Sequence, residues 1–197
     1  AFTDDMQPLV RAVFYDDTNQ YSVWTRTWKN VFNIWAAPTG ADGEGCTRTF
    51  AAPASTVRAA FDGTAILHRN AFRDCASITL GGGAGTTQTN LGDAAWVMVH
   101  EAGHYLFGLG DEYVGGGNWS ISVPKNVFST QSDCESNSVS NSLPSSQCVQ
   151  IGSSGTWRND DGQATTMEDR QLGSDWRTLS GRAMGNLLSS CVNGTCY

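Results

Sequence analysis

A chain of 197 residues is long enough to bury the core of one globular domain, and its 40% hydrophobic and 16% charged residues are typical of folded proteins. Its 12 basic residues against 19 acidic ones leave a net charge of −7, which argues against a nucleic-acid partner because few cations are present to neutralise phosphates. No segment is apolar over the length of a membrane span, and the first residues lack the sections of a signal peptide, so we expect no membrane partner and a mature or trimmed chain.

The first half of the chain predicts helices and strands in succession. Thr3 can cap a first helix in which apolar residues recur at helical spacing, namely Met6, Leu9, Val10, Val13 and Phe14. Residues 21–29 predict a second helix or an irregular segment, 31–37 a buried strand, and 64–68 and 76–80 two further strands. The glycine-rich residues 81–90 predict a connection, and residues 92–107 predict a helix with small and apolar side chains on one side.

The second half of the chain is richer in loop-forming residues. Residues 129–155 are crowded with serine, asparagine and glutamine and show no sustained periodicity, which predicts a long surface loop. Residues 176–190 predict a last helix, because apolar residues again recur at helical spacing.

The chain contains six cysteines, an even number, and no C-x2-C pair of the kind that binds zinc. Disulfides are therefore the favoured interpretation. Short intervening loops suggest that Cys134 pairs with Cys148 and Cys191 with Cys196. This leaves Cys46 to pair with Cys75. Disulfides persist in oxidising compartments, so we expect a secreted, extracellular protein.

The predicted helix at 92–107 contains an HExxH motif. His100 and His104 are four residues apart, so on a helix both imidazoles project from one face and can share a zinc ion. Glu101 follows the first histidine, where its carboxylate can hold a water beside the metal and remove its proton. The alternative is a solvated helix with two surface histidines, but the chain has only three histidines, which makes a chance match rare.

Catalytic zinc normally has three protein ligands and a water, so a further donor is needed nearby. Gly108 and Gly110 can end the helix and let the chain turn back beneath the metal. This turn would bring Asp111 or Glu112 to the third position, and Asp111 is favoured. The remaining histidine, His68, lies on a predicted strand and is expected to be a core or edge residue.

The segment HEAGHYLFGLGDEY, residues 100–113, resembles the metzincin signature HExxHxxGxxH, although the glycine comes one residue late and aspartate replaces the third histidine. It is more similar to the bacterial IgA-cleaving type of zinc metalloendopeptidase, whose helix reads approximately HEFGHSFxGLxDEY. The resemblance covers about half of the chain and implies that His100, His104 and Asp111 are ligands and Glu101 is catalytic. It implies peptide hydrolysis, without implying immunoglobulin as the substrate.

Metzincins also place a methionine in a tight turn under the zinc. The resemblance implies Met167 for this position, as a packing residue rather than a ligand, with Met184 as the weaker candidate.

These observations together predict an α/β (α+β) metzincin-like domain with a mixed twisted sheet, an active-site helix and a loop-rich, disulfide-containing C-terminal half. We expect one catalytic domain over 1–197, with an N-terminal subdomain to about residue 111 and a C-terminal subdomain from about residue 112. The expected activity is zinc-dependent cleavage of protein or peptide substrates by a monomer. Two alternatives stay open, which are a zinc hydrolase of a non-protein amide such as cell-wall peptide, and a catalytically silent, metal-stabilised binding module.

Three acidic clusters could hold a structural Ca²⁺ ion through their carboxylate oxygens. They are Asp16 with Asp17, Asp42 with Glu44, and Asp160 with Asp161. None matches an EF-hand loop, and solvated acidic side chains in turns are the more frequent explanation for such clusters.

Overall fold

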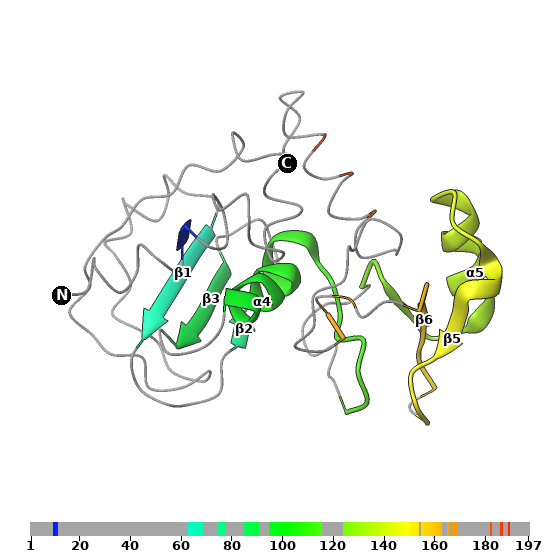
Figure 1. Ribbon diagram of the computed structural model, residues 1–197, viewed down its shortest axis with the longest axis horizontal. Helices are drawn as coiled ribbons and strands as arrows, with labels where there is room; N and C mark the ends of the chain where they lie inside the picture. The colour runs from blue at the N-terminus through cyan, green and yellow to red at the C-terminus, as the bar shows by residue number, and fades with distance from the viewer. Residues whose placement is uncertain are drawn as a thin grey trace.

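The computed structural model describes residues 10–11, 63–68, 75–77, 85–90, 95–115, 124–153, 155–162, 165, 167–168, 182, 186 and 189 (Figure 1). These residues form two small three-stranded sheets and two α-helices, a mixture of the α+β type that was predicted. Among them there is no helix long and apolar enough to cross a membrane.

The first sheet has the strand order β1-β3-β2, from β1 (Gly63–His68), β3 (Gly85–Asn90) and β2 (Cys75–Ser77). β1 is parallel to β3 and β2 is antiparallel to it, so the sheet is mixed, as expected. The strand predicted at 64–68 is confirmed, and the one predicted at 76–80 begins at Cys75 and is described as far as Ser77.

The prediction of a connection at 81–90 is wrong for its second half, since Gly85–Asn90 is the central strand. This strand has the sequence GTTQTN, in which threonine, a β-branched residue that favours extended backbone, occupies three of six positions. Pairing with strands on both sides stabilises it through backbone hydrogen bonds, which a search for apolar residues does not detect.

The helix α4 (Ala95–Phe107) contacts strands β2 and β3, and Figure 1 shows it beside the first sheet. Val99 and Ala102, two residues of the apolar side predicted for this helix, are buried, and so is Phe107 at its end. Gly108, with a φ angle of 65°, ends the helix in the left-handed conformation that glycine adopts without steric cost. Its N–H donates to the carbonyl of His104 at 3.2 Å, which completes the helix end predicted from the glycines.

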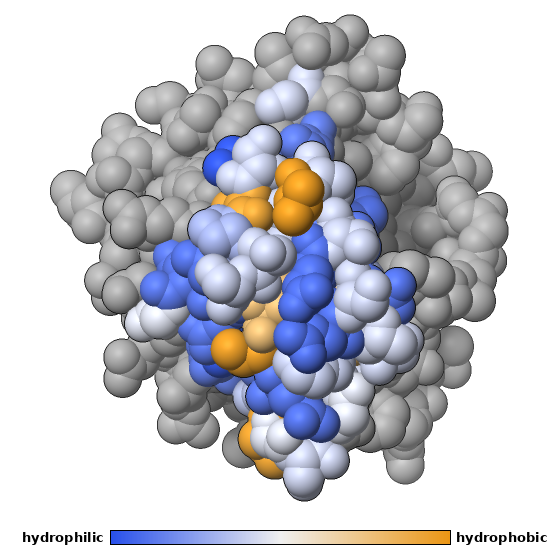
Figure 2. Space-filling model, turned by 90° about the vertical axis from the view of Figure 1, so that its right-hand side faces the viewer, coloured by the Kyte–Doolittle hydropathy of each residue, from blue (hydrophilic) through white to orange (hydrophobic). Residues whose placement is uncertain are grey.

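The second sheet is antiparallel and has the order β4-β6-β5, from β4 (Val127–Phe128), β6 (Trp157–Asn159) and β5 (Cys148–Gln150). The helix α5 (Gln131–Ser140) contacts all three strands, and the short 3-10 helix η3 (Ser145–Gln147) precedes β5. The prediction of a long loop at 129–155 is therefore wrong. This part of the chain is mostly polar at its surface, with separate hydrophobic areas (Figure 2).

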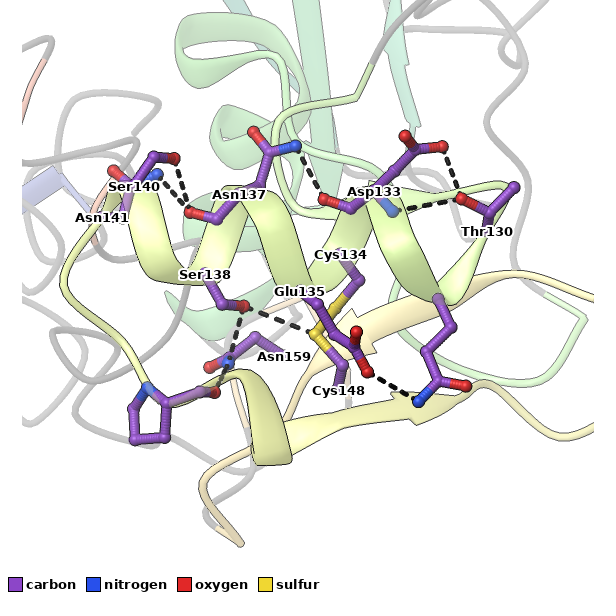
Figure 3. Close-up of a disulfide and its surroundings, with 12 residues drawn as sticks. Thr130, Asp133, Cys134, Glu135, Asn137, Ser138, Ser140, Asn141, Cys148 and Asn159 are labelled. Carbon is purple, nitrogen blue, oxygen red and sulfur yellow. Dashed lines mark hydrogen bonds between the residues drawn. A yellow bond between two sulfur atoms is a disulfide. The ribbon is translucent and has the colours of Figure 1, made fainter.

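The disulfide predicted between Cys134 and Cys148 is confirmed, with an S–S distance of 2.02 Å. It joins α5 to β5, and Figure 3 shows Ser138 and Asn159 beside it. The Ser138 hydroxyl lies 3.4 Å from the sulfur of Cys148 and accepts a hydrogen bond from the Asn159 side chain at 3.1 Å. The buried hydroxyl of Ser138 and the side-chain N–H of Asn159 are thus paired with each other in this small core.

Several predictions fall outside the described residues. They concern the segments 21–29 and 31–37, the remaining two cysteine pairs, and most of the first and last predicted helices. Of the first helix the structure describes Val10 and Arg11, and of the last Arg182, Asn186 and Ser189, all of which are helical.

Candidate metal centre

Helix α4 places His100 and His104 side by side on one face, with ring centroids 4.8 Å apart and the planes nearly perpendicular. The turn that follows Gly108 brings Asp111 back to both rings. One ligand atom from each of these three residues lies within 4.8 Å of the other two. The structure therefore brings together the three residues that the sequence predicted as metal ligands.

The separations between these ligand atoms fit a shared metal ion. Asp111 Oδ1 lies 3.1 Å from His100 Nε2 and 3.3 Å from His104 Nε2. Two ligands that are each about 2.0–2.1 Å from a tetrahedral zinc ion stand roughly 3.3 Å apart. The two distances from Asp111 to the imidazoles match this spacing, and the three ligand atoms all lie within 4.8 Å of one another. Imidazole nitrogen and carboxylate oxygen are both common zinc donors.

The electrostatics of this group favour a positive charge at its centre. Burial opposes ionisation of Asp111, yet the hydrogen bonds and charges of the two histidines hold its pKa well below the usual range. Burial likewise opposes protonation of His104, but the neighbouring Asp111 carboxylate raises its pKa. Both pKa shifts have the same cause, because the Asp111 carboxylate and a positively charged imidazole stabilise each other. The positive charge can come from a proton on the imidazole or from a divalent cation bound between the two groups.

The second nitrogen of His104 fixes how this ring faces the centre. Its Nδ1 lies 2.7 Å from the carbonyl oxygen of Leu109. A carbonyl can only accept, so Nδ1 carries the hydrogen and a neutral His104 directs the lone pair of Nε2 towards Asp111. This is the tautomer that a metal ligand requires.

Glu101 lies on α4 directly after His100 and is 8% exposed. Burial lowers the pKa of His104, whereas the negative charges of Asp111 and Glu101 both raise it, so Glu101 acts electrostatically on the centre. The ring of Tyr113 lies near the site, with its centroid 6.2 Å from that of His100. The predicted base is thus buried on the same helix as two of the three predicted ligands.

Met167 packs against α4 at Gly103, between the two histidines. The methionine is fully buried, and a Cβ atom added at Gly103 would lie 2.5 Å from its sulfur. A larger residue at this position would therefore have to displace the side chain of Met167. The structure thus places Met167 against α4 at Gly103, and its position under a zinc ion stays a prediction. Met184 lies outside the described residues.

Glu112, the alternative third ligand, lies at a different place from Asp111. Its carboxylate accepts hydrogen bonds from the Asn126 side chain at 2.7 Å and from the Thr165 hydroxyl at 2.5 Å. Asn126 and Thr165 were not predicted to be functional, because neither belongs to a recognisable motif.

The other metal-related predictions are only partly described. His68 is the last residue of β1, as expected, and the structure describes its backbone. In the described part of the chain, His100, His104 and Asp111 form the only group of three or more side chains that could hold a metal. Asp160 instead bonds Arg158 at 2.7 Å and the N–H of Gly162 at 2.7 Å, and the other two acidic clusters lie outside the described residues.

Comparison of the chain with known protein families, with curated proteins and with solved structures finds no match.

Proposed function

We propose that the protein is a secreted zinc-dependent endopeptidase of metzincin-like type that uses Glu101 as its general base. The observation that carries this proposal is the cluster of His100, His104 and Asp111, next to Glu101 in the chain. Asp111 Oδ1 lies 3.1 Å from Nε2 of His100 and 3.3 Å from Nε2 of His104. Two histidines and a carboxylate also suit iron, but iron sites of this type do not require an adjacent glutamate. The HExxH arrangement on α4 favours zinc and hydrolysis.

In the proposed reaction, zinc and Glu101 have separate chemical roles. When bound, zinc supplies a Lewis acid that polarises the scissile carbonyl and stabilises the charge that develops on its oxygen. Glu101 accepts a proton from the attacking water as the new C–O bond forms, and donates it to the amide nitrogen as the C–N bond breaks. His104 is held in its ligating tautomer by the Leu109 carbonyl.

Secretion is supported by the disulfide between Cys134 and Cys148, because such bonds are rare in reducing compartments. The acidic composition gives no support to a nucleic-acid partner. We therefore propose protein or peptide as the substrate of a monomeric enzyme. A zinc hydrolase of cell-wall amides would use the same residues.

Glu101→Ala tests this function directly. We expect the variant to retain zinc, measured by elemental analysis, and to hydrolyse labelled casein at least about 100-fold more slowly than the wild type, because the proton acceptor is lost. Asp111→Ala should lose zinc as well as activity. Glu135→Ala, the same change on α5, is the matched control and should behave as the wild type.

Three results would contradict the proposal or redirect it. Casein hydrolysis by Glu101→Ala at the wild-type rate would exclude the proposed mechanism. Release of cell-wall peptides by a wild type that leaves casein intact would favour the non-protein amide. A wild type that binds zinc and hydrolyses neither substrate would favour the binding module.

A further inference from the structure

Glu112 is buried, although it does not belong to the group of His100, His104 and Asp111 that could hold a metal ion. Glu112 is 2% exposed, and a buried charge is costly unless several donors stabilise it. Asn126 Nδ2 donates to one of its oxygens at 2.7 Å, and Thr165 Oγ1 donates to the other at 2.5 Å. The position of this carboxylate is therefore fixed by two side chains from distant parts of the chain.

Asn126 also holds the backbone on the other side of Asp111. Its Oδ1 accepts from the N–H of Gly110 at 2.7 Å, and its Nδ2 donates to the carbonyl of Gly110 at 2.9 Å. One asparagine, fully buried, thus bonds both neighbours of Asp111. We call Asn126, Glu112 and Thr165 the Asn126 brace.

The backbone of Glu112 is hydrogen-bonded to other parts of the chain, as its side chain is. Its N–H donates to the carbonyl of Met167 at 2.8 Å, and its carbonyl accepts from Arg158 Nη1 at 2.8 Å. Arg158 also bonds Glu168 at 2.5 Å. Burial opposes the charge of Arg158, but Glu168 and Glu112 raise its pKa, so the guanidinium stays charged.

We propose that Glu112 is a positioning residue, whose carboxylate anchors the backbone that carries Asp111 and so sets the metal affinity of the centre. This inference rests on the proposed metal centre. Asp111 must hold one oxygen near two imidazoles at once, and a small shift of its backbone would weaken both contacts. Residues that orient ligands commonly change metal affinity about 10–100-fold when they are altered.

The test is the binding of Co²⁺, a zinc substitute whose visible absorption reports its ligands, to metal-free protein. Glu112→Gln keeps the volume of the side chain but removes its charge and one acceptor. We expect Co²⁺ affinity to fall about tenfold or more, with the absorption bands of the wild type unchanged at saturation, because the ligands are the same. Circular dichroism establishes that the variant is folded at the temperature of the titration.

Variants of Thr165 provide a second route that leaves Glu112 intact. Thr165→Val has nearly the same shape but loses the hydroxyl, and should weaken Co²⁺ binding, whereas Thr165→Ser keeps the hydroxyl and should preserve it. If Glu112→Gln does not fold, this pair decides the question. Glu135→Gln on α5 is the matched control and should bind Co²⁺ as the wild type does.

Each contrary result has a distinct meaning. Unchanged affinity in a folded Glu112→Gln, even with a lower melting temperature, would show a merely structural residue and overturn the inference. Altered absorption bands at saturation would make Glu112 a ligand and also overturn it. Failure of the wild type to bind Co²⁺ or zinc would overturn the metal centre itself, and this inference with it.

Discussion

Gly103 lies on α4 between the two histidines, where Met167 packs against the helix. Glycine in a helix interior costs about 1 kcal/mol relative to alanine, so this position carries a local penalty. A Cβ atom here would stand 2.5 Å from the sulfur of Met167, and the methionine is fully buried. Forcing an extra carbon into a packed core costs about 1–3 kcal/mol, which exceeds the gain in helix propensity.

Gly103→Ala is therefore expected to lower the free energy of unfolding by about 1 kcal/mol, measured by urea denaturation. In a Met167→Ala background the clash is absent, and Gly103→Ala should instead raise the free energy of unfolding by up to about 1 kcal/mol. An equal effect of Gly103→Ala in both backgrounds would mean that Met167 does not restrict this position.

The residues of the centre differ in how far the sequence predicts them. His100, Glu101 and His104 form a recognisable motif at helical spacing. The turn expected at Gly108 and Gly110 brings Asp111 or Glu112 to the third position, of which Asp111 is favoured. The brace residues could not be predicted in this way. Thr165 is 53 residues from Glu112, and such a hydrogen bond depends on how distant segments meet.

At the scale of elements, α5 shows how a helix without an apolar stripe can form. Its buried positions are Cys134 and Ser138, four residues apart, and the rest of the helix is polar except for the exposed Val139. Thr130 caps it, since its hydroxyl oxygen accepts from the N–H of Asp133 at 3.1 Å. The hydroxyl of Thr130 also donates to the carboxylate of Asp133 at 2.6 Å.

Thr130→Ala should lower the free energy of unfolding by about 1 kcal/mol, because two N-terminal hydrogen bonds of α5 are lost. Thr130→Ser keeps the hydroxyl and should cost much less. Chemical denaturation of the two variants measures the difference. If both destabilise the protein equally, packing of the methyl group rather than capping explains the effect.

The sequence predicts some elements better than others for physical reasons. Residues 64–68 contain a short apolar run and residues 92–107 contain apolar residues at helical spacing, and both elements are present as β1 and α4. The strand β3 and the helix α5 lack such patterns and were missed. For α5 the spacing of Thr130 and Asp133 was a usable signal, because a threonine followed three residues later by an acidic residue is typical of a helix start.

At the scale of the whole molecule, hydrogen bonds connect the metal centre to the region of the second sheet. Asp111 follows α4, while Arg158 on β6 bonds the neighbouring Glu112. The carbonyl of Gly108, at the end of α4, accepts from the N–H of Lys125 just before β4 at 3.3 Å. A metal held by Asp111 and α4 would therefore stabilise segments that are far apart in sequence.

Zinc should accordingly raise the thermal stability of the metal-free protein. A ligand at 100 times its dissociation constant that binds only the folded state adds about 2.7 kcal/mol, which corresponds to a rise of about 5–10 °C for a chain of this length. Differential scanning fluorimetry with and without zinc measures the change. Asp111→Ala should show almost no rise, and a rise equal to that of the wild type would place the stabilising zinc elsewhere.

The central claim is that His100, His104 and Asp111 hold one zinc ion, and anomalous X-ray diffraction at the zinc absorption edge from zinc-loaded crystals tests it most directly. The predicted result is an anomalous peak about 2.0–2.2 Å from both Nε2 atoms and from a carboxylate oxygen of Asp111. Zinc bound by the two histidines with Glu112 in place of Asp111, or no peak at this cluster, would contradict the claim.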